Sequence, residues 1–535
     1  MSEMIYNPLE EYNRKFKNLH EENTSKYFEE LVRKSQVDVE ENRKTVKKYA
    51  ELSDNLLKAR KKLNFWRVMR VLMIITIVLI PLVIIKITPK IKSLRKRSED
   101  LSNEIAATMT LAQNQMRPLN LLFTDEDALR IIENTIPNIS FSQNFSVAQE
   151  SDMTVNYDFL DNNDCERSTE DILAGKFNGN PFLLESMLFH RMGVETYHGY
   201  KVIHWVETYH DSDGKTHTKV RTQTLHATVT KPKPFYDKKV VLNYCAQGAP
   251  DLSFTRDATH LERKSEKEIE KYIKKGEKKL KKKTDKAIKQ NKDFVSMSNS
   301  DFEVLFDALD RTNEVQFRTL FTPLAQTNMV DLIRSQTSYG DDFDFIKRKR
   351  TNTIITQHSQ GRPIILNTRE YFSYSFDTVK SNFTGKNADY FKSLYFNFAP
   401  IWAIPVYQEK PVHSLAPIQN QAQKYSYKEY ETLVNKADPR LVVHPQTKTQ
   451  AILKTSFIKP ENGSDKICVS AFSYDIIKNL DFVPVHGDDG RWHNVPVEWD
   501  EYIPLEISND FFVSAYDAVN NKNVIAHRNN LCIFD

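Results

Sequence analysis

The feature that constrains this chain most is one apolar run, Val68–Ile87, with the sequence VMRVLMIITIVLIPLVIIKI. Between Val71 and Ile85 it holds no charged residue, and only one threonine and one proline interrupt the aliphatic side chains. A helix rises about 1.5 Å per residue, so a run of this length matches the roughly 30 Å of a bilayer core. The sequence therefore predicts a transmembrane helix at residues 65–87 in a single-pass protein of the cell membrane, with the lipid bilayer as a partner.

The charges that flank the run leave its orientation open. Six lysines and arginines lie in the twenty residues before Val71, and six lie in the twenty residues that start at Lys86. The positive-inside rule therefore favours neither side. We expect a single crossing. The alternatives are a segment that re-enters at Pro81, with both flanks on one side, and a buried core helix, which is seldom apolar on all faces.

Residues 1–64 are charged and almost free of helix breakers, which predicts one long helix. A partly apolar seam with heptad spacing runs along it, formed by Phe28, Val32, Val39, Val46, Tyr49, Leu56 and Leu63. The seam predicts pairing as a coiled coil and hence a homo-oligomer. A solvated helix that lies on the rest of the protein is the alternative. Asn42 falls in the seam and would fix its register. Residues 88–137 are expected to form juxtamembrane helices.

Composition and motifs argue against several kinds of enzyme. Only 13 glycines occur, and neither GxGxxG nor GxxxxGK[ST] is present, so no phosphate-cradling loop is expected. HExxH and GxSxG are absent as well. The four cysteines are widely spaced and match neither a disulfide framework nor a zinc motif. With a net charge of +4, no nucleic-acid partner is expected. We assign no catalytic, cofactor-binding or metal-binding residue and no cofactor.

Residues 138–335 are predicted to form a mixed α+β domain, irregular and polar as far as about residue 191. Two β-like segments at 200–210 and 215–230 flank an Asp-Gly pair, which predicts a hairpin. A two-residue turn there would place His210 opposite His217, with His204 on the same face. Three histidines on one face raise the hypothesis of a metal site. The alternative, which we favour, is a polar coat on a solvated face.

A lysine-rich segment, 262–292, follows within this domain. Fourteen basic and six acidic residues are interspersed along it, and Ile269, Ile273 and Leu280 form a thin helical stripe. This pattern predicts a solvated helix that packs through one stripe. Contact with anionic lipid headgroups is the alternative, because each lysine or arginine near such a surface contributes on the order of 1 kcal/mol.

The stretch after this helix resembles a known family. Asp301–Phe306 and Asn313–Pro323 are similar to the core of a bacterial membrane-protein family called domain of unknown function 3137. The matching residues are Phe302, Val304, Arg318, Thr322 and Pro323. The resemblance implies a bacterial protein with hydrophobic anchors before an α+β module, and a strand at Phe302–Val304. It supplies no catalytic residue, because the family has no settled activity. From the residues alone, Thr322 is expected to cap a helix that begins at Pro323.

The rest of the chain is predicted to be rich in strands. Residues 336–408 are aromatic and β-branched and are expected to continue the sheet, with 390–407 as one strand-like segment. Residues 409–425 contain proline and glutamine and are expected to form a linker. Residues 426–535 form a β-rich C-terminal module of short strands, with a hairpin turn at Asp489-Gly490. Histidines and aspartates at this turn could bind a metal, but solvated loop tips are the expectation.

These predictions define an α+β protein with a long N-terminal helix, one transmembrane helix, a mixed α+β soluble module and a β-rich module. The function we expect is that of a membrane-anchored structural or interaction protein, self-associating through the helices beside the membrane segment and presenting its soluble modules to a protein partner. An envelope sensor is the first alternative. A metal-dependent enzyme at the histidine-rich hairpin is the second.

Overall fold

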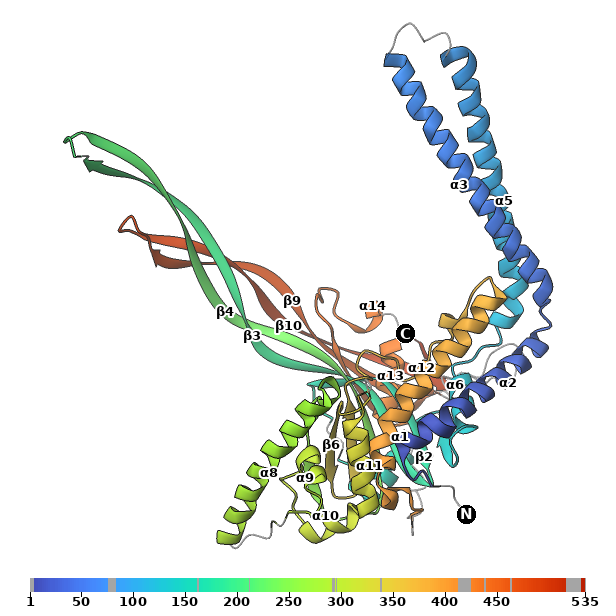
Figure 1. Ribbon diagram of the computed structural model, residues 1–535, viewed down its shortest axis with the longest axis vertical. Coiled ribbons are helices and arrows are strands. Elements are labelled where there is room, and N and C mark those ends of the chain that lie inside the picture. The colour runs from blue at the N-terminus through green and yellow to red at the C-terminus, as the bar shows by residue number, and fades with distance from the viewer. Residues whose placement is uncertain are drawn as a thin grey trace.

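The computed structural model of the chain shows an α+β body from which a helical hairpin and two long β-ribbons project (Figure 1). The residues that the structure describes are 4–75, 83–160, 163–210, 212–290, 294, 296–336, 339–411, 425–436, 439–461, 464–515 and 531–534. The apolar stretch 76–82, most of the expected linker at 409–425 and residues 516–530 lie outside this part of the chain.

The N-terminal segment forms several helical pieces rather than one. They are α1 (Pro8–Glu11), the π-helical η1 (Tyr12–Phe16), α2 (Lys17–Ser35), α3 (Val39–Ile75), the π-helical η3 (Val83–Ile87) and α5 (Thr88–Asn120). The expected continuous helix is broken because Gln36 adopts a left-handed conformation, with φ of 54°, at the C-cap of α2. Helix α2 packs on the body, whereas α3 and α5 leave it together (Figure 1).

Helices α3 and α5 form an antiparallel hairpin. Gln115 Nε2 donates to Thr45 Oγ1 at 3.1 Å near the body, and Lys48 pairs with Glu104 at 2.9 Å farther out. The buried face of α3 includes Leu52, Ala59 and Leu63. Of these only Leu63 belongs to the heptad-like seam, whose Val46, Tyr49 and Leu56 are half-buried. Asn42, also buried, bonds to Gln115 on α5 and to the backbone of α12.

The expectation of a transmembrane helix at residues 65–87 is wrong. In the part of the chain that the structure describes, no helix has both the length and the apolar content needed to span a membrane. The described parts of the apolar run lie at the end of α3 and in η3. These two helices belong to opposite arms of the hairpin and pack on each other through Leu63, Val83 and Ile87. The single-pass topology and the corresponding localisation in the cell membrane are therefore corrected as well.

A seven-stranded antiparallel sheet forms the centre of the body, in the order β1-β2-β3-β4-β7-β6-β5. Its strands are β1 (Ile139–Phe141), β2 (Arg167–Phe177), β3 (Asn180–His210), β4 (Thr216–Cys245), β5 (Ser253–Arg256), β6 (Phe343–Arg348) and β7 (Thr351–Thr356). Residues 138–191, expected to be irregular, thus supply much of the sheet. The apolar runs at 172–174 and 182–184 are buried against the covering helices, which explains why they do not alternate with polar residues.

Helices cover the sheet and form the main core with it. They are α6 (Asp127–Glu133), α7 (Val147–Tyr157), α8 (Glu266–Lys289), α9 (Ser300–Phe306), α10 (Glu314–Leu320), α11 (Pro323–Arg334) and α12 (Phe376–Trp402), with short 3₁₀ turns η4 (Leu261–Arg263), η5 (Thr368–Tyr371) and η6 (Pro405–Gln408). The expected helix in 262–292 is confirmed, with Ile269, Ile273 and Leu280 buried. The cap is also confirmed: Thr322 Oγ1 accepts from the backbone N–H of Ala325.

Two strand predictions in this region are wrong. Residues 300–306 form helix α9, capped by Asn299. Residues 336–408 contain only two short described strands, and their largest element is α12, whose apolar residues at 376, 379, 383, 390, 391, 394, 395 and 398 follow helical three-four spacing. The aromatic composition indicated strands, but the spacing decides the structure, because it places one continuous face of α12 in the core.

A second antiparallel sheet has the order β11-β10-β9-β8, with β8 (Ile452–Glu461), β9 (Ser464–His486), β10 (Trp492–Ala515) and β11 (Leu531–Phe534). It follows α13 (Tyr427–Lys436) and α14 (Pro439–Val442). The hairpin at Asp489-Gly490 is confirmed, but its strands are long rather than short. Helix α13 joins the two sheets: Lys428 pairs with Glu185 of β3 at 2.7 Å, and Glu431 pairs with Lys454 of β8 at 3.0 Å.

Beyond the body, the ribbons β3–β4 and β9–β10 run side by side (Figure 1). Their facing sides share a small core that includes Ile203, Leu225, Val495 and Val497. At Gly199 the ribbons approach so closely that a Cβ atom would lie 2.0 Å from the carbonyl oxygen of Pro496. Glycine is therefore required at this crossing, and the two ribbons form one composite arm.

Candidate functional site

The most distinctive exposed surface is the outer end of the α3–α5 hairpin, which we call the hairpin end and define by its described residues 54–75 and 83–99. Several of its large apolar side chains are exposed to 47–72%, namely Leu57, Phe65, Val68, Val71, Leu72, Ile74 and Ile85. They belong to both arms of the hairpin. Soluble surfaces seldom expose contiguous apolar patches without a partner, so the hairpin end is a candidate docking surface.

Basic residues surround these apolar side chains. Between Asp54 and Glu99 the sequence contains twelve lysines and arginines and no acidic residue. All twelve side chains lie in the described segments, where they are exposed. Ion pairs in these segments form only at the inner margin, where Lys58 pairs with Asp54 and Arg95 with Glu99. The hairpin end therefore combines an apolar surface with a strongly positive collar.

Contacts between the two arms hold the hairpin end together. Leu63 of α3 packs on Ile87 and Ile91, and Trp66 and Met73 extend the same buried face. The Trp66 ring lies 4.6 Å from Lys90 Nζ in a cation–π contact. The remaining apolar side chains stay outside this interface, so they are not needed to join the arms.

The histidine-rich ribbon does not place its three histidines together. Strand β3 ends at His210 and β4 begins at Thr216, which pairs His210 with Thr216 and Tyr209 with His217. The turn is longer than the expected two residues, so His217 lies on the opposite face from His204 and His210. His204 and His210 are six residues apart on β3, which corresponds to roughly 20 Å. This spacing is too long for one metal ion.

These histidines have local partners instead. His204 Nδ1 and Thr222 Oγ1 are 2.9 Å apart, and His210 Nδ1 and Thr216 Oγ1 are 3.1 Å apart. At the second ribbon's turn, His493 pairs with Asp489 at 2.9 Å. Within the described residues, no three histidine, cysteine, aspartate or glutamate side chains converge as metal ligands would.

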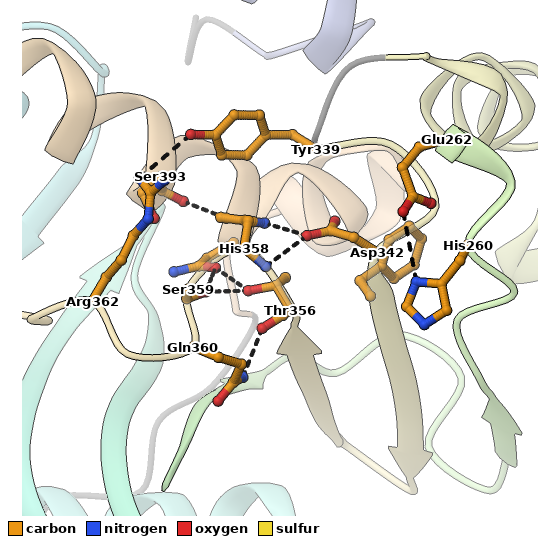
Figure 2. Close-up of polar contacts among 12 residues, drawn as sticks. His260, Glu262, Tyr339, Asp342, Thr356, His358, Ser359, Gln360, Arg362 and Ser393 are labelled. Atoms are coloured by element: carbon orange, nitrogen blue, oxygen red, sulfur yellow. Dashed lines mark hydrogen bonds and ion pairs between the residues drawn. The ribbon is translucent and has the colours of Figure 1, made fainter. Parts of the chain in front are cut away.

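Figure 2 shows a buried polar cluster where β7 meets α12. His358 Nδ1 lies 2.6 Å from Asp342 Oδ2, and Nε2 donates to the carbonyl oxygen of Ser393 at 3.1 Å. Beside it, the hydroxyls of Thr356 and Ser359 each donate to Asn397 Oδ1 at 2.6 Å. The cluster was not predicted, because its members come together only through long-range packing.

The geometry of this cluster does not fit nucleophilic catalysis. Both ring nitrogens of His358 are occupied by Asp342 and Ser393, whereas the hydroxyl of Ser359 is directed to Asn397. A general base must reach the proton that it removes. His358 is also only 3% exposed. The observed contacts tie the β6–β7 hairpin to α12, which is a positioning role.

Another buried titratable group is Lys347 on β6. Burial lowers the pKa of its ammonium to about 7, and the nearby Arg350 guanidinium acts in the same direction. The Nζ atom donates to the carbonyl oxygens of Gly248 and Lys349 and lies over the Tyr407 ring. These contacts saturate the amine, so we assign it a structural role.

No protein-family model, curated protein or solved structure matches the chain. The resemblance of residues 199–335 to domain of unknown function 3137 stays a prediction.

Proposed function

We propose that this protein is an interaction protein that docks through the hairpin end onto an anionic lipid surface and holds its body and ribbon arm at a distance from it. The observation that carries the proposal is the coincidence of exposed apolar side chains with twelve basic residues and no acidic residue between Asp54 and Glu99. Apolar side chains favour the interfacial region of lipids, and lysine and arginine favour its anionic headgroups.

The shape of the hairpin supports this arrangement. Helix α3 has 37 residues, which corresponds to roughly 55 Å. The outer end of this helix, which carries most of the exposed apolar side chains, lies away from the body (Figure 1). The docking proposed here involves the end of an antiparallel hairpin and needs no helix that spans the lipid. Two such ends would repel each other through their like charges, so a second copy is a poorer partner for this surface.

The experiment that tests the proposal is co-sedimentation of the full chain with phosphatidylcholine vesicles, with and without phosphatidylserine. We expect binding to the anionic vesicles and much weaker binding to the neutral ones. The charge-reversal variant Lys61→Glu/Lys62→Glu should weaken binding by about 2 kcal/mol or more, roughly thirtyfold in affinity. The variant Val71→Ser/Ile85→Ser should also lose binding, because both side chains are exposed and available to enter the interface.

The lysine-rich helix α8 supplies the matched control. Ile288 is 70% exposed on α8, among many lysines. The variants Ile288→Ser and Lys278→Glu/Lys282→Glu should leave vesicle binding unchanged. If they abolish it while the hairpin variants do not, α8 is the docking element and the proposal is wrong. Absence of binding to both kinds of vesicle would also overturn it.

A further inference from the structure

A cavity of about 300 Å³ lies beside the buried cluster, between α12, the loop after β7 and the central sheet. This volume is at the lower end of the range for small-molecule sites. Its apolar wall comprises Leu184, Val240, Ile364, Leu366, Tyr390 and Leu394. Leu184 and Val240 come from the sheet, and the other four residues follow them by 124 to 210 positions, so long-range packing creates the cavity.

Polar groups with unused hydrogen-bonding capacity face this cavity. Ser393 is 7% exposed and Asn397 is 4% exposed, and both line it. Among the described residues, the Ser393 hydroxyl and the Asn397 amide nitrogen have no hydrogen-bond partner, since Ser393 engages His358 through its backbone carbonyl and Asn397 accepts through its oxygen. Both residues line the cavity, so these groups are available to donate hydrogen bonds to a bound molecule.

Arg362 provides a charge at the rim. Its guanidinium forms no ion pair with a described residue, and its one side-chain hydrogen bond is a long contact of 3.5 Å to Tyr339 Oη. Figure 2 shows Arg362 extended toward Ser393. Lys386, also in the lining, pairs with Glu370 at 2.6 Å. Asp389 adds a second carboxylate, so the formal charges of the lining sum to zero. Because the lining has no net charge, an anion would be held by direct contact with the Arg362 guanidinium.

We propose that this cavity binds a small carboxylic acid with an apolar body, whose carboxylate accepts hydrogen bonds from Arg362 and Ser393 and whose chain lies against Leu184, Val240 and Leu394. A planar guanidinium is suited to a carboxylate because it can donate two parallel hydrogen bonds. The buried His358–Asp342 pair fixes the backbone of Ser393 and thereby positions its hydroxyl.

The test is isothermal titration calorimetry of the full chain with octanoate, and with octan-1-ol as a ligand of equal apolar length without charge. We expect saturable binding of octanoate and weaker binding of octanol. Arg362→Met should weaken octanoate binding about tenfold and bring it to the level of octanol, because a charge-assisted hydrogen bond is lost. Ser393→Ala should weaken it about threefold to tenfold through loss of one hydrogen bond.

Arg369→Met is the matched control, since Arg369 is exposed on η5 but does not line the cavity. It should bind octanoate as the unchanged protein does. The thermal midpoint of each variant, measured in parallel, shows whether it is folded. No saturable octanoate binding by the folded, unchanged protein would mean that the cavity holds only water, and equal affinity for octanoate and octanol would exclude carboxylate recognition. Either result overturns the proposal. Vesicle binding at the hairpin end is a separate measurement, so the two proposals can fail independently.

Discussion

Lys90 Nζ lies 4.6 Å from the centre of the Trp66 ring and thus links the two arms of the hairpin close to its outer end. Trp66 is therefore a built-in reporter of the proposed docking surface. The chain contains four other tryptophans, none of them on the hairpin. Amphipathic tryptophan rings favour the lipid–water interface.

The first prediction uses this reporter. Vesicles that contain phosphatidylserine and brominated phosphatidylcholine should quench the tryptophan fluorescence of the unchanged protein, because bromine quenches only at short range. The variant Trp66→Phe should lose most of this quenching. Trp492→Phe should retain it, although Trp492 is 70% exposed on the ribbon arm. Equal quenching in Trp66→Phe and the unchanged protein would show that another part of the molecule faces the lipid.

The salt dependence of vesicle binding gives a second prediction. The Debye length falls from about 10 Å at 0.1 M salt to about 3 Å at 1 M, so the attraction between the basic collar and the headgroups should weaken strongly. Co-sedimentation with anionic vesicles should therefore decrease as sodium chloride is raised. The residual binding should depend on the apolar side chains and disappear in Val71→Ser/Ile85→Ser. Binding that rises with salt would instead indicate a purely apolar contact.

Much of this surface could be read from the sequence, but not its arrangement. The apolar run and the six-to-six balance of its flanking charges are sequence properties. A balanced flank also fits a hairpin whose two arms return to one body, as the contact between Lys48 and Glu104 shows. Heptad-like spacing in α3 did not reveal whether its partner is another chain or α5, because both satisfy the same apolar seam.

Long-range packing explains most of the other differences. The sequence of α12 contains two conflicting signals. Its aromatic composition favours strands, whereas the three-four spacing of its apolar residues favours a helix. The lengths of β9 and β10 depend on the neighbouring ribbon, which buries Val495 and Val497. The cavity was not predictable, since Leu184 and Leu394 are 210 positions apart. The Thr322 cap and the Asp489-Gly490 turn were predicted correctly, because each depends only on residues close together in the sequence.

The third prediction concerns the crossing of the ribbons. Gly199→Ala would place a Cβ atom 2.0 Å from the Pro496 carbonyl oxygen, so the ribbons must separate there. Hydrogen exchange of backbone amides in residues 480–499 should become faster, because the small core between the ribbons opens. Gly385→Ala is the control: no atom lies within 4 Å of its added Cβ, and the helix should be unchanged or slightly stabilised. Unchanged exchange in Gly199→Ala would show that the ribbons are not held together at this point.

The fourth prediction concerns the joint between the two sheets. Lys428→Met leaves the carboxylate of Glu185 buried without its cation, because both side chains are at most 5% exposed. The free energy of unfolding, measured in urea, should fall by about 3–5 kcal/mol. Adding Glu185→Gln should recover part of this loss, since the uncompensated charge is removed. The control Lys436→Met breaks an exposed pair with Asp171 and should cost less than about 1 kcal/mol. Similar losses for both lysines would contradict the assigned role of α13.

The last prediction is a pH dependence of stability that originates at His20. This side chain is 1% exposed, stacks on Phe391 and donates from Nε2 to the carbonyl oxygen of Asn387. Burial lowers the pKa of His20 from 6.5 to about 4, and the hydrogen bond to Asn387 opposes this shift only in part. The unfolded chain therefore binds a proton between pH 6.5 and 4 that the folded chain does not.

Stability from neutral His20 is thus complete above pH 6.5 and is lost as the pH falls toward 4, by about 3 kcal/mol over this interval. Between pH 6.5 and 4, the free energy of unfolding should fall by about 3 kcal/mol less in His20→Gln than in the unchanged protein. His198→Gln, at an exposed position on β3, should retain the full slope. Equal slopes in His20→Gln and the unchanged protein would mean that His20 is protonated in the folded state, which its burial against the Phe391 ring argues against.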